Sequence, residues 1–198
     1  MREYDRWEGR FSADDYIFGT APNAFLLRQR ALLPKSGRAL AVADGEGRNG
    51  VWLAEQGLDV VSMDYSPTAQ VKARKLAADR GVSISTEQVD LSNWTWPENA
   101  YDVIVVIFAQ PLDRDALFAG VRRALKPGGL LLIEGYTPKQ ISYGTGGPSD
   151  VERLYTYEQV ERAFRGMSEV RIDEHDVEIY EGEGHGGMSA VIDLIARK

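Results

Sequence analysis

The chain contains no cysteine, so disulfide bonds, thiolate metal sites and a cysteine nucleophile are all excluded. No apolar run approaches the roughly 18 residues that a membrane-spanning helix needs. The first five residues are largely charged and lack the apolar centre of a secretion signal. We therefore expect a cytoplasmic protein that has no membrane partner.

Basic side chains are scarce relative to acidic ones, because 23 Lys and Arg residues stand against 30 Asp and Glu residues. The net charge is −7. A protein that binds nucleic acid broadly needs Lys and Arg clustered on one face to neutralise phosphates, so we expect no nucleic-acid partner. The length suits a single domain, since a chain of this size buries about 70% of its unfolded surface.

Three glycines interrupt the chain after its first apolar run. The run covers residues 38–43, the glycines are Gly45, Gly47 and Gly50, and a helical pattern follows over 51–56. Strand, glycine turn and helix in this order open a βαβ unit. Glycine lets the chain reverse and lets a ligand approach the backbone at the carboxyl end of the strand. The G-x-G-x-x-G pattern suits a dinucleotide, S-adenosylmethionine or simply a tight turn.

An acidic residue ends the next predicted strand. Asp64 follows residues 58–63 and stands twenty positions after Asp44. In nucleotide-binding folds, an acid at this distance accepts hydrogen bonds from ribose hydroxyls. The alternative is that Asp64 only caps the following turn.

Strands and helices alternate from residue 38 to residue 134, which predicts an α/β fold with a doubly wound parallel sheet. Strands are expected at 38–43, 58–63, 82–89, 101–109 and 130–134, and helices at 51–56, at 67–80 and up to 125 after Asp113 or Asp115. The helix at 67–80 has the clearest signals, because Ser66 is a good N-cap, Pro67 suits the first helical position and Gly81 stops the helix.

The two ends of the chain complete one predicted domain over residues 1–198. Residues 1–33 form an N-terminal cover and helix, and the aromatic residues within 1–20 either pack on the sheet edge or close the cofactor cleft. Residues 38–134 form the cofactor-binding core. Residues 135–198 hold a long loop at 136–148, a helix at 157–167 and two strands at 170–180 and 188–196, whose short connection predicts antiparallel pairing.

Five features in order resemble a class I S-adenosylmethionine-dependent methyltransferase. They are the loop 44–49, Asp64-Tyr65-Ser66, Asp90-Leu91 after the third strand, the turn 125–129 and the closing pair of strands. Within that class, residues 18–26 and 46–49 resemble the small tellurite-resistance-type and thiopurine-like methyltransferases. The resemblance implies a Rossmann-like sheet of seven mostly parallel strands, with an antiparallel C-terminal strand and helices on both faces.

The same resemblance implies the cofactor, S-adenosyl-L-methionine, and the residues that hold it. These are Ala43, Asp44, Gly45, Gly47, Arg48 and Asn49 in the glycine loop, Asp64 at the ribose with Tyr65 after it, Asp90 and Leu91 at the adenine, and Phe108 beside the methionine part. For Leu91 and Phe108 the alternative is an ordinary core position. The family loop usually opens with an acid and a glycine where this chain has Ala41 and Ala43, so Asp44, Glu46 or backbone contacts are left to hold the methionine part.

The implied reaction is an in-line displacement at an activated sulfonium, for which the protein mainly supplies orientation. A base is needed only when the acceptor holds its proton tightly. We expect a small-molecule acceptor, which is a thiol, a selenium or tellurium oxyanion or a similar group. Tyr16 and Tyr143 are the candidate substrate residues, no metal is expected, and the protein should be a monomer or a homodimer.

His185 is the candidate catalytic residue. The glycines around it, in 183–187, let the backbone turn and carry the imidazole over the carboxyl end of the sheet. Imidazole can accept a proton from a thiol or a phenol, or stabilise its anion when protonated. The alternative is a solvent-exposed loop histidine beside the acidic run 173–181. His175 lies within a predicted strand and is the weaker candidate.

Two other functions share part of this pattern. An NAD(P)-dependent oxidoreductase would share the glycine motif and Asp64, but we expect no second catalytic domain, and the chain has no Tyr-x-x-x-Lys pair for hydride chemistry. A non-catalytic S-adenosylmethionine-binding module is the other alternative. Methylation of nucleic-acid amino groups is disfavoured, because residues 108–111 read Phe-Ala-Gln-Pro where base-modifying enzymes usually carry Asn/Asp-Pro-Pro-Tyr/Phe.

Overall fold

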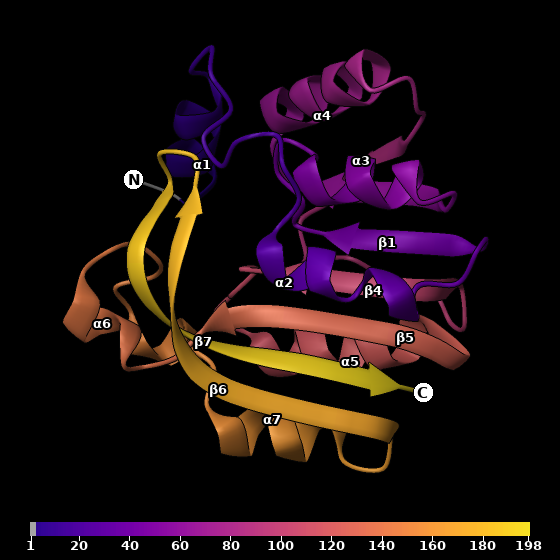
Figure 1. Ribbon diagram of the computed structural model, residues 1–198, viewed down its shortest axis with the longest axis vertical. Helices are drawn as coiled ribbons and strands as arrows, with labels where there is room; N and C mark the ends of the chain where they lie inside the picture. Colours follow the sequence, from indigo (N-terminus) through magenta and orange to yellow (C-terminus); the bar gives the residue numbers. More distant parts are fainter. Residues whose placement is uncertain (1–2) are drawn as a thin grey trace.

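The computed structural model describes residues 3–198, and Figure 1 shows helices on both faces of one central sheet. Residues 1 and 2, the start of the predicted cover, lie outside the described range. The helices are α1 (Glu3–Phe11), α2 (Ala24–Arg28), α3 (Arg48–Glu55), α4 (Pro67–Asp79), α5 (Arg114–Ala124), α6 (Gln140–Tyr143) and α7 (Tyr157–Phe164), with short 3-10 turns η1 (Arg30–Leu32) and η2 (Val151–Arg153). The strands are β1 (Arg38–Val42), β2 (Asp59–Asp64), β3 (Ser85–Gln88), β4 (Tyr101–Ile107), β5 (Leu125–Tyr136), β6 (Ser168–Glu181) and β7 (His185–Arg197).

The seven strands lie in the order β3-β2-β1-β4-β5-β7-β6. Strands β1 to β5 run parallel to one another, and β7 runs antiparallel to both β5 and β6. This order confirms the predicted doubly wound, Rossmann-like sheet with an antiparallel C-terminal strand. The long β6–β7 hairpin extends beyond the rest of the sheet, and its tip lies near the N-terminal segment (Figure 1), where the Gly184 N–H donates to the Ile17 carbonyl over 2.9 Å.

Two apolar clusters hold the helices to the sheet. On one face, α2 and α3 bury Phe25 and Trp52 against β1 and β4. On the other face, α5 and α7 bury Phe118 and Phe164 against the same strands and against β5. All of β4 is buried except Asp102, as a central parallel strand covered on both faces requires.

Pairing between strands moves several boundaries from their predicted places. Only Ser85–Gln88 pairs with β2, so β3 is shorter than the predicted strand at 82–89. Strand β5 begins at Leu125 rather than at residue 130, because Leu125 already pairs with β4. The β6–β7 ladder runs on until Glu181 faces His185, which shortens the predicted connection at 181–187 to residues 182–184. Within the predicted cover and the predicted long loop, the short helices α1 and α6 form.

Two residues with side chains adopt the left-handed backbone region at the carboxyl ends of central strands. Ala43 follows β1 with a φ of 49°, and Phe108 follows β4 with a φ of 54°. A residue with a Cβ atom is strained by about 1–2 kcal/mol in this region. Ala43 therefore adopts a glycine-like conformation where the methyltransferase loop that the sequence resembles usually has a glycine.

Replacing Ala43 with glycine should raise the free energy of unfolding by about 0.5–1 kcal/mol, because relief of the left-handed strain exceeds the added chain entropy of glycine. The matched control is Ala41→Gly, inside β1, which should lower stability because no strain is relieved there. Urea denaturation of both variants measures the difference. An equal loss of stability in both would show that Ala43 is not strained.

Candidate cofactor and acceptor site

The glycine turn between β1 and α3 is shaped by close packing as much as by backbone conformation. Gly45 and Gly47 have φ values of 56° and 89°. A Cβ atom on Gly47 would lie 2.6 Å from the Cβ of Ala73 on α4, and one on Gly45 would lie 3.2 Å from the ring of Phe11. Any larger side chain would thus force α4 or the N-terminal segment away from the turn.

Asp44 opens this turn with a carboxylate that faces into the fold. Both of its oxygens accept from the Gly50 N–H, at 3.1 and 3.2 Å, and Oδ2 also accepts from the Ser62 hydroxyl over 2.7 Å. Burial raises the pKa of Asp44 to about 7, although these hydrogen bonds oppose the shift. The side chain therefore holds β1, β2 and α3 together, and its predicted contact with a cofactor stays a prediction.

Asp64 lies at the end of β2 beside the glycine turn, where the sequence predicted it. Its Oδ2 accepts from the Gly45 N–H over 3.0 Å and its Oδ1 accepts from the Ser66 N–H over 2.9 Å. The residue is 6% exposed, and burial raises its pKa to about 6. Asp64 thus caps the following turn and also contacts the glycine turn, so the two interpretations of this residue are compatible.

Two more predicted cofactor residues follow β3. Asp90 is exposed and accepts hydrogen bonds from Ser92, which lower the pKa of Asp90. Leu91 is half-buried and packs against the main apolar cluster. Both residues lie on the same edge of the sheet as Asp64, because Val89 continues from β3 and its N–H donates to the Asp64 carbonyl over 2.9 Å.

Helix α1 and the segment after it cover the glycine turn. Phe11 is 3% exposed and lies against Gly45, while Glu8 accepts hydrogen bonds from the hydroxyls of Ser66 and Thr68 at the start of α4. Further along, Glu46 accepts from the Ile17 N–H over 2.8 Å. Residues 43–49, 64 and 65 are consequently buried or half-buried under this cover.

His185 is buried among aromatic rings rather than exposed in a loop. It is 7% exposed, so the alternative of a solvent-exposed loop histidine is wrong. Its ring centroid lies 4.5 Å from that of Phe18, 4.6 Å from that of Phe108 and 5.8 Å from that of Tyr136. Burial lowers the pKa of His185, which favours the neutral imidazole.

A buried ion pair lies beside this imidazole. The guanidinium of Arg48 contacts Glu181 Oε2 at 2.6 Å, and His185 Nδ1 lies 3.4 Å from the same oxygen. Burial opposes ionisation of Glu181, but His185 and Arg48 prevail and lower the pKa of Glu181 to about 2. Sequence reasoning missed Glu181 because it appeared as one more acid in the run 173–181, and only the hairpin places it against Arg48.

The other predicted residues are less closely tied to His185. The Asn49 side chain accepts from the Asn23 N–H over 2.9 Å and so secures the start of α2. The Tyr16 hydroxyl donates to the Lys72 carbonyl on α4 over 3.1 Å, and Tyr143 ends α6 with the Lys139 ammonium over its ring. The predicted substrate roles of Tyr16 and Tyr143 stay predictions, whereas Phe18 and Tyr136, which the sequence did not single out as site residues, contact His185 together with Phe108.

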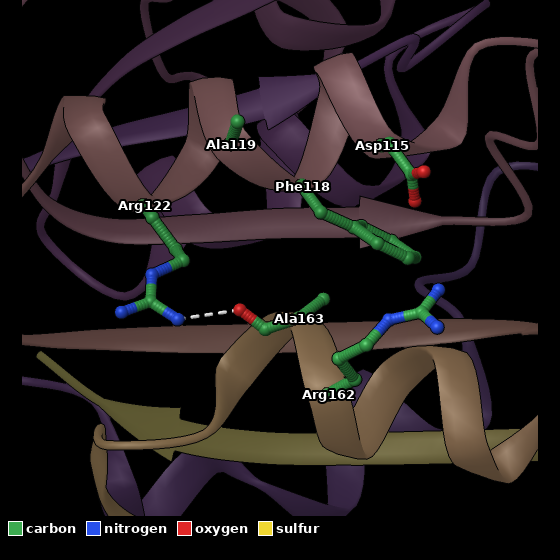
Figure 2. Close-up of a pocket in the computed structure, with 6 residues that line it drawn as sticks. All are labelled: Asp115, Phe118, Ala119, Arg122, Arg162 and Ala163. Carbon is green, nitrogen blue, oxygen red and sulfur yellow. Dashed lines mark hydrogen bonds between the residues drawn. The ribbon is translucent and has the colours of Figure 1, made fainter.

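Two clefts lie away from the glycine turn. One, of about 400 Å³, lies between α5 and α7, where Phe118 and Arg162 face each other and Arg122 donates to the Ala163 carbonyl (Figure 2). The other, of about 290 Å³, lies between α2 and the β6–β7 pair. No helix within residues 3–198 is long and apolar enough to cross a membrane. Within the same residues, no group of three His, Cys, Asp or Glu side chains could hold a metal.

Comparison with known proteins agrees with this geometry. Residues 39–129 match the family model described as a methyltransferase domain. The demethylmenaquinone methyltransferase of Thermus thermophilus is 29% identical over 105 residues, which are 51% of this chain and 48% of that protein. A ubiquinone/menaquinone biosynthesis C-methyltransferase of Shewanella frigidimarina is 33% identical over 85 residues, which are 40% of this chain and 34% of that protein. The chain thus spans about half or less of the length of these curated relatives.

Solved structures share the whole fold. One, described by the conversion of a disulfide bond into a thioacetal group during echinomycin biosynthesis, superposes with a TM-score of 0.78 at 18% identity, covering 100% of this chain and 92% of the other. TehB from Haemophilus influenzae superposes with a TM-score of 0.69 at 18% identity, covering 100% of this chain and 67% of the other.

The buried Asp44 should make stability depend on pH. Its raised pKa, about 7, means that the folded state binds more protons than the unfolded state at mildly acidic pH, so the free energy of unfolding falls as the pH rises towards 7. Asp44→Asn removes this titrating group but keeps a side-chain amide that can form hydrogen bonds with the Gly50 N–H and the Ser62 hydroxyl. As the pH rises from about 4 to 7, the free energy of unfolding of the variant should therefore increase by roughly 1–3 kcal/mol relative to that of the wild type.

Urea denaturation over this pH range measures the gain. The control is Asp59→Asn, whose side chain is 71% exposed and which should leave the pH dependence unchanged. A pH dependence as steep in Asp44→Asn as in the wild type would show that Asp44 does not contribute to it, because only the smaller part that is due to the other buried acids should remain.

Proposed function

Because residues 39–129 match a methyltransferase-domain model and the whole fold is shared with the solved structures above, we propose that this chain is a class I S-adenosylmethionine-dependent methyltransferase that transfers a methyl group to a small acceptor held beside His185. S-adenosyl-L-methionine is the methyl donor of this family. The observation that supports the acceptor position is the convergence of Arg48, Glu181 and His185 with three aromatic rings, next to the carboxyl ends of β1 and β4. This is the edge of the sheet where α/β folds bind their ligands.

The residues at the glycine turn fit this cofactor. A Cβ atom would collide with Ala73 at Gly47 and would crowd Phe11 at Gly45, and Arg48 Nη1 is buried without a hydrogen-bond partner in residues 3–198. We assign that guanidinium to the carboxylate of the methionine part. This contact would compensate for the acid and the glycine that the family loop usually has where this chain has Ala41 and Ala43. Asp64 would hold the ribose, because each of its oxygens accepts one backbone N–H and keeps a further lone pair.

Asp90 and Leu91 would face the adenine, and Phe108 would separate the cofactor from the acceptor. When bound, the cofactor supplies a methyl group already activated on a sulfonium. The protein then has to orient the acceptor and exclude water, and the half-buried ring of Phe108 and the buried ring of Tyr136, stacked with centroids 4.6 Å apart, would do both.

His185 is suited to take a proton from the acceptor. The Glu181 carboxylate beside Nδ1 favours the tautomer in which Nδ1 carries the hydrogen, so Nε2 keeps its lone pair. The lowered pKa of His185 keeps the ring neutral at physiological pH. A thiol or phenol could therefore lose its proton to Nε2 as the methyl group is transferred.

We place the acceptor among thiols, selenium or tellurium oxyanions and similar soft groups. The description of the structural neighbour from echinomycin biosynthesis names a reaction at sulfur. The similarity in fold to TehB supports the resemblance to the tellurite-resistance-type subgroup. The names of the curated relatives point to quinone-type rings instead, so phenols belong in the same test. A screen of thiols, selenite and phenols that follows release of S-adenosylhomocysteine decides between these classes, and no turnover on any of them would favour a non-catalytic binding module.

Binding of S-adenosylhomocysteine should be measurable by calorimetry, whereas NAD⁺ should give no heat of binding. In the same complex, residues 3–20 should exchange amide hydrogens more slowly than in the free protein, because α1 and the segment after it would close over the cofactor. Binding of NAD⁺ alone would exclude the methyltransferase proposal. Equal exchange in both states would assign α1 to structural packing.

His185→Ala should lower turnover by about 10²–10⁴-fold with a protonated acceptor, the usual range for a lost general base, and less with an ionised acceptor. Affinity for S-adenosylhomocysteine should persist, because the change removes no proposed cofactor contact. The control is His175→Gln on β6, which should keep most of its turnover. Full activity of His185→Ala at every pH would rule out a catalytic role.

A further inference from the structure

A row of carboxyl groups crosses three strands next to the proposed site. Glu134 on β5 faces Asp193 on β7, and Asp193 faces Asp173 on β6. Residues directly opposite in antiparallel strands point to the same face, with Cβ atoms about 4.5–5.5 Å apart. Glu134 is 3% exposed and Asp193 is 7% exposed. Two buried carboxyl groups this close cannot both ionise cheaply, so the Glu134–Asp193 pair shares one proton.

The groups around the pair agree with a shared proton. Burial, and then the Asp193 carboxylate, raises the pKa of Glu134 well above its ordinary value. Burial also raises the pKa of Asp193 to about 6, although His175, Glu134 and Arg28 oppose the shift. The Arg28 guanidinium lies 3.6 Å from Asp193 Oδ2, and Asp193 Oδ1 is buried without a hydrogen-bond partner in residues 3–198.

A single amide connects this pair to the imidazole. Asn23 Nδ2 donates to Glu134 Oε2 over 2.5 Å and to Glu181 Oε1 over 3.1 Å, and the other oxygen of Glu181 contacts His185. Asn23 cannot turn away, because its Oδ1 caps α2 by accepting from the Leu26 N–H over 2.9 Å. Glu134 and Glu181 therefore share the Asn23 amide, which holds Glu181 in place together with Arg48 and the Ala24 N–H.

Solvent reaches the pair from the side remote from the glycine turn. The cleft of about 290 Å³ between α2 and the β6–β7 pair is lined by Asp193, His175 and Arg28. Asp173 lies at its rim, with a side chain that is 79% exposed. A proton can thus enter or leave the pair without passing through the proposed acceptor position.

We infer that Asn23 is a positioning residue that couples the Glu134–Asp193 pair to His185, so that release of the pair's proton through this cleft alters the proposed site. With the proton present, one negative charge lies on the pair and Asn23 bridges Glu134 and Glu181. Once the proton is lost, Glu134 becomes a full carboxylate that holds its Asn23 hydrogen more strongly and repels Glu181, so Glu181 is held less firmly. The pKa of His185 responds to the charges of Glu181, Arg48 and Arg10, so the imidazole senses the displacement of Glu181. The effect on turnover rests on the proposed function, whereas the coupling itself does not.

Histidine NMR on the ligand-free, full-length protein tests the coupling directly. The chain has two histidines, so His175→Gln assigns both resonances. Besides its own titration, which burial moves to lower pH, His185 should show a second inflection at higher pH from the Glu134–Asp193 pair. Glu134→Gln, which mimics the protonated state, should abolish that inflection.

Two further variants complete the test. Asn23→Ser keeps the α2 cap but lacks the bridging amide, and it should also abolish the inflection. The matched control, Asp173→Asn, removes a charge from the same row without touching Asn23, and it should keep the inflection. An inflection that is absent from the wild type, or that persists in Glu134→Gln, would overturn the inference.

Turnover separates this inference from the proposed function. In Asn23→Ser, kcat should fall by about tenfold to 100-fold while the affinity for S-adenosylhomocysteine is kept, the pattern expected of misplaced catalytic groups. Coupling seen by NMR without turnover on any acceptor would sink the proposed function alone. Turnover without coupling would sink the inference alone.

Discussion

The buried ion pair between Arg48 and Glu181 joins the two halves of the molecule at the edge where ligands would bind. Arg48 begins α3 behind the glycine turn, and Glu181 ends β6 at the tip of the C-terminal hairpin. Both side chains are about one-tenth exposed or less, and their contact distance is 2.6 Å. Removing one partner of such a pair typically costs about 3–5 kcal/mol, because the other charge stays buried. The hairpin, and with it His185, is therefore held over the sheet by this contact.

Strain gathers at the same edge. Ala43 and Phe108 both leave their strands in the left-handed region, and both lie where a cofactor would approach the backbone. Strained residues of this kind persist only when the surrounding structure holds them. Here Asp44 anchors the first turn through Gly50 and Ser62, and the Phe108 N–H donates to the Glu134 carbonyl over 2.8 Å.

Buried acids are the electrostatic signature of this protein. Burial raises the pKa values of Asp44, Asp64, Glu134 and Asp193, whereas Glu181 alone among these acids is strongly ionised, because a guanidinium and an imidazole contact it. Each raised acid lowers stability as the pH rises through its titration range. A fold optimised only for stability would replace such groups with apolar side chains, so their position around one edge agrees with a functional role.

The cover formed by α1 is attached to the glycine turn through a small number of side chains. Its Phe11 is buried against Gly45 of the glycine turn, and its Glu8 accepts hydrogen bonds from hydroxyls at the start of α4. These contacts are few compared with those that hold the central strands. A segment attached in this way suits the proposed closure of α1 over the cofactor, which stays a prediction.

Local signals in the sequence were enough to identify several elements. Apolar runs identified β1, β2 and β4, and Ser66, Pro67 and Gly81 marked α4 almost to the residue, because capping and periodicity act within a few positions. The glycine turn and Asp64 were likewise identified, since their spacing follows from the βαβ geometry. Strand ends were less accurate, because β3, β5 and the closing hairpin extend as far as their partners pair with them.

The surroundings of His185, in contrast, follow from tertiary contacts alone. Glu181 lies 133 residues from Arg48, and Asn23 lies 111 residues from Glu134, so no periodicity or spacing relates them. The burial of His185, the pairing of Glu134 with Asp193 and the docking of α1 depend on the register of the antiparallel β7 strand and on close packing of distant segments. Such contacts arise from the shape of the whole fold, which local sequence patterns do not encode.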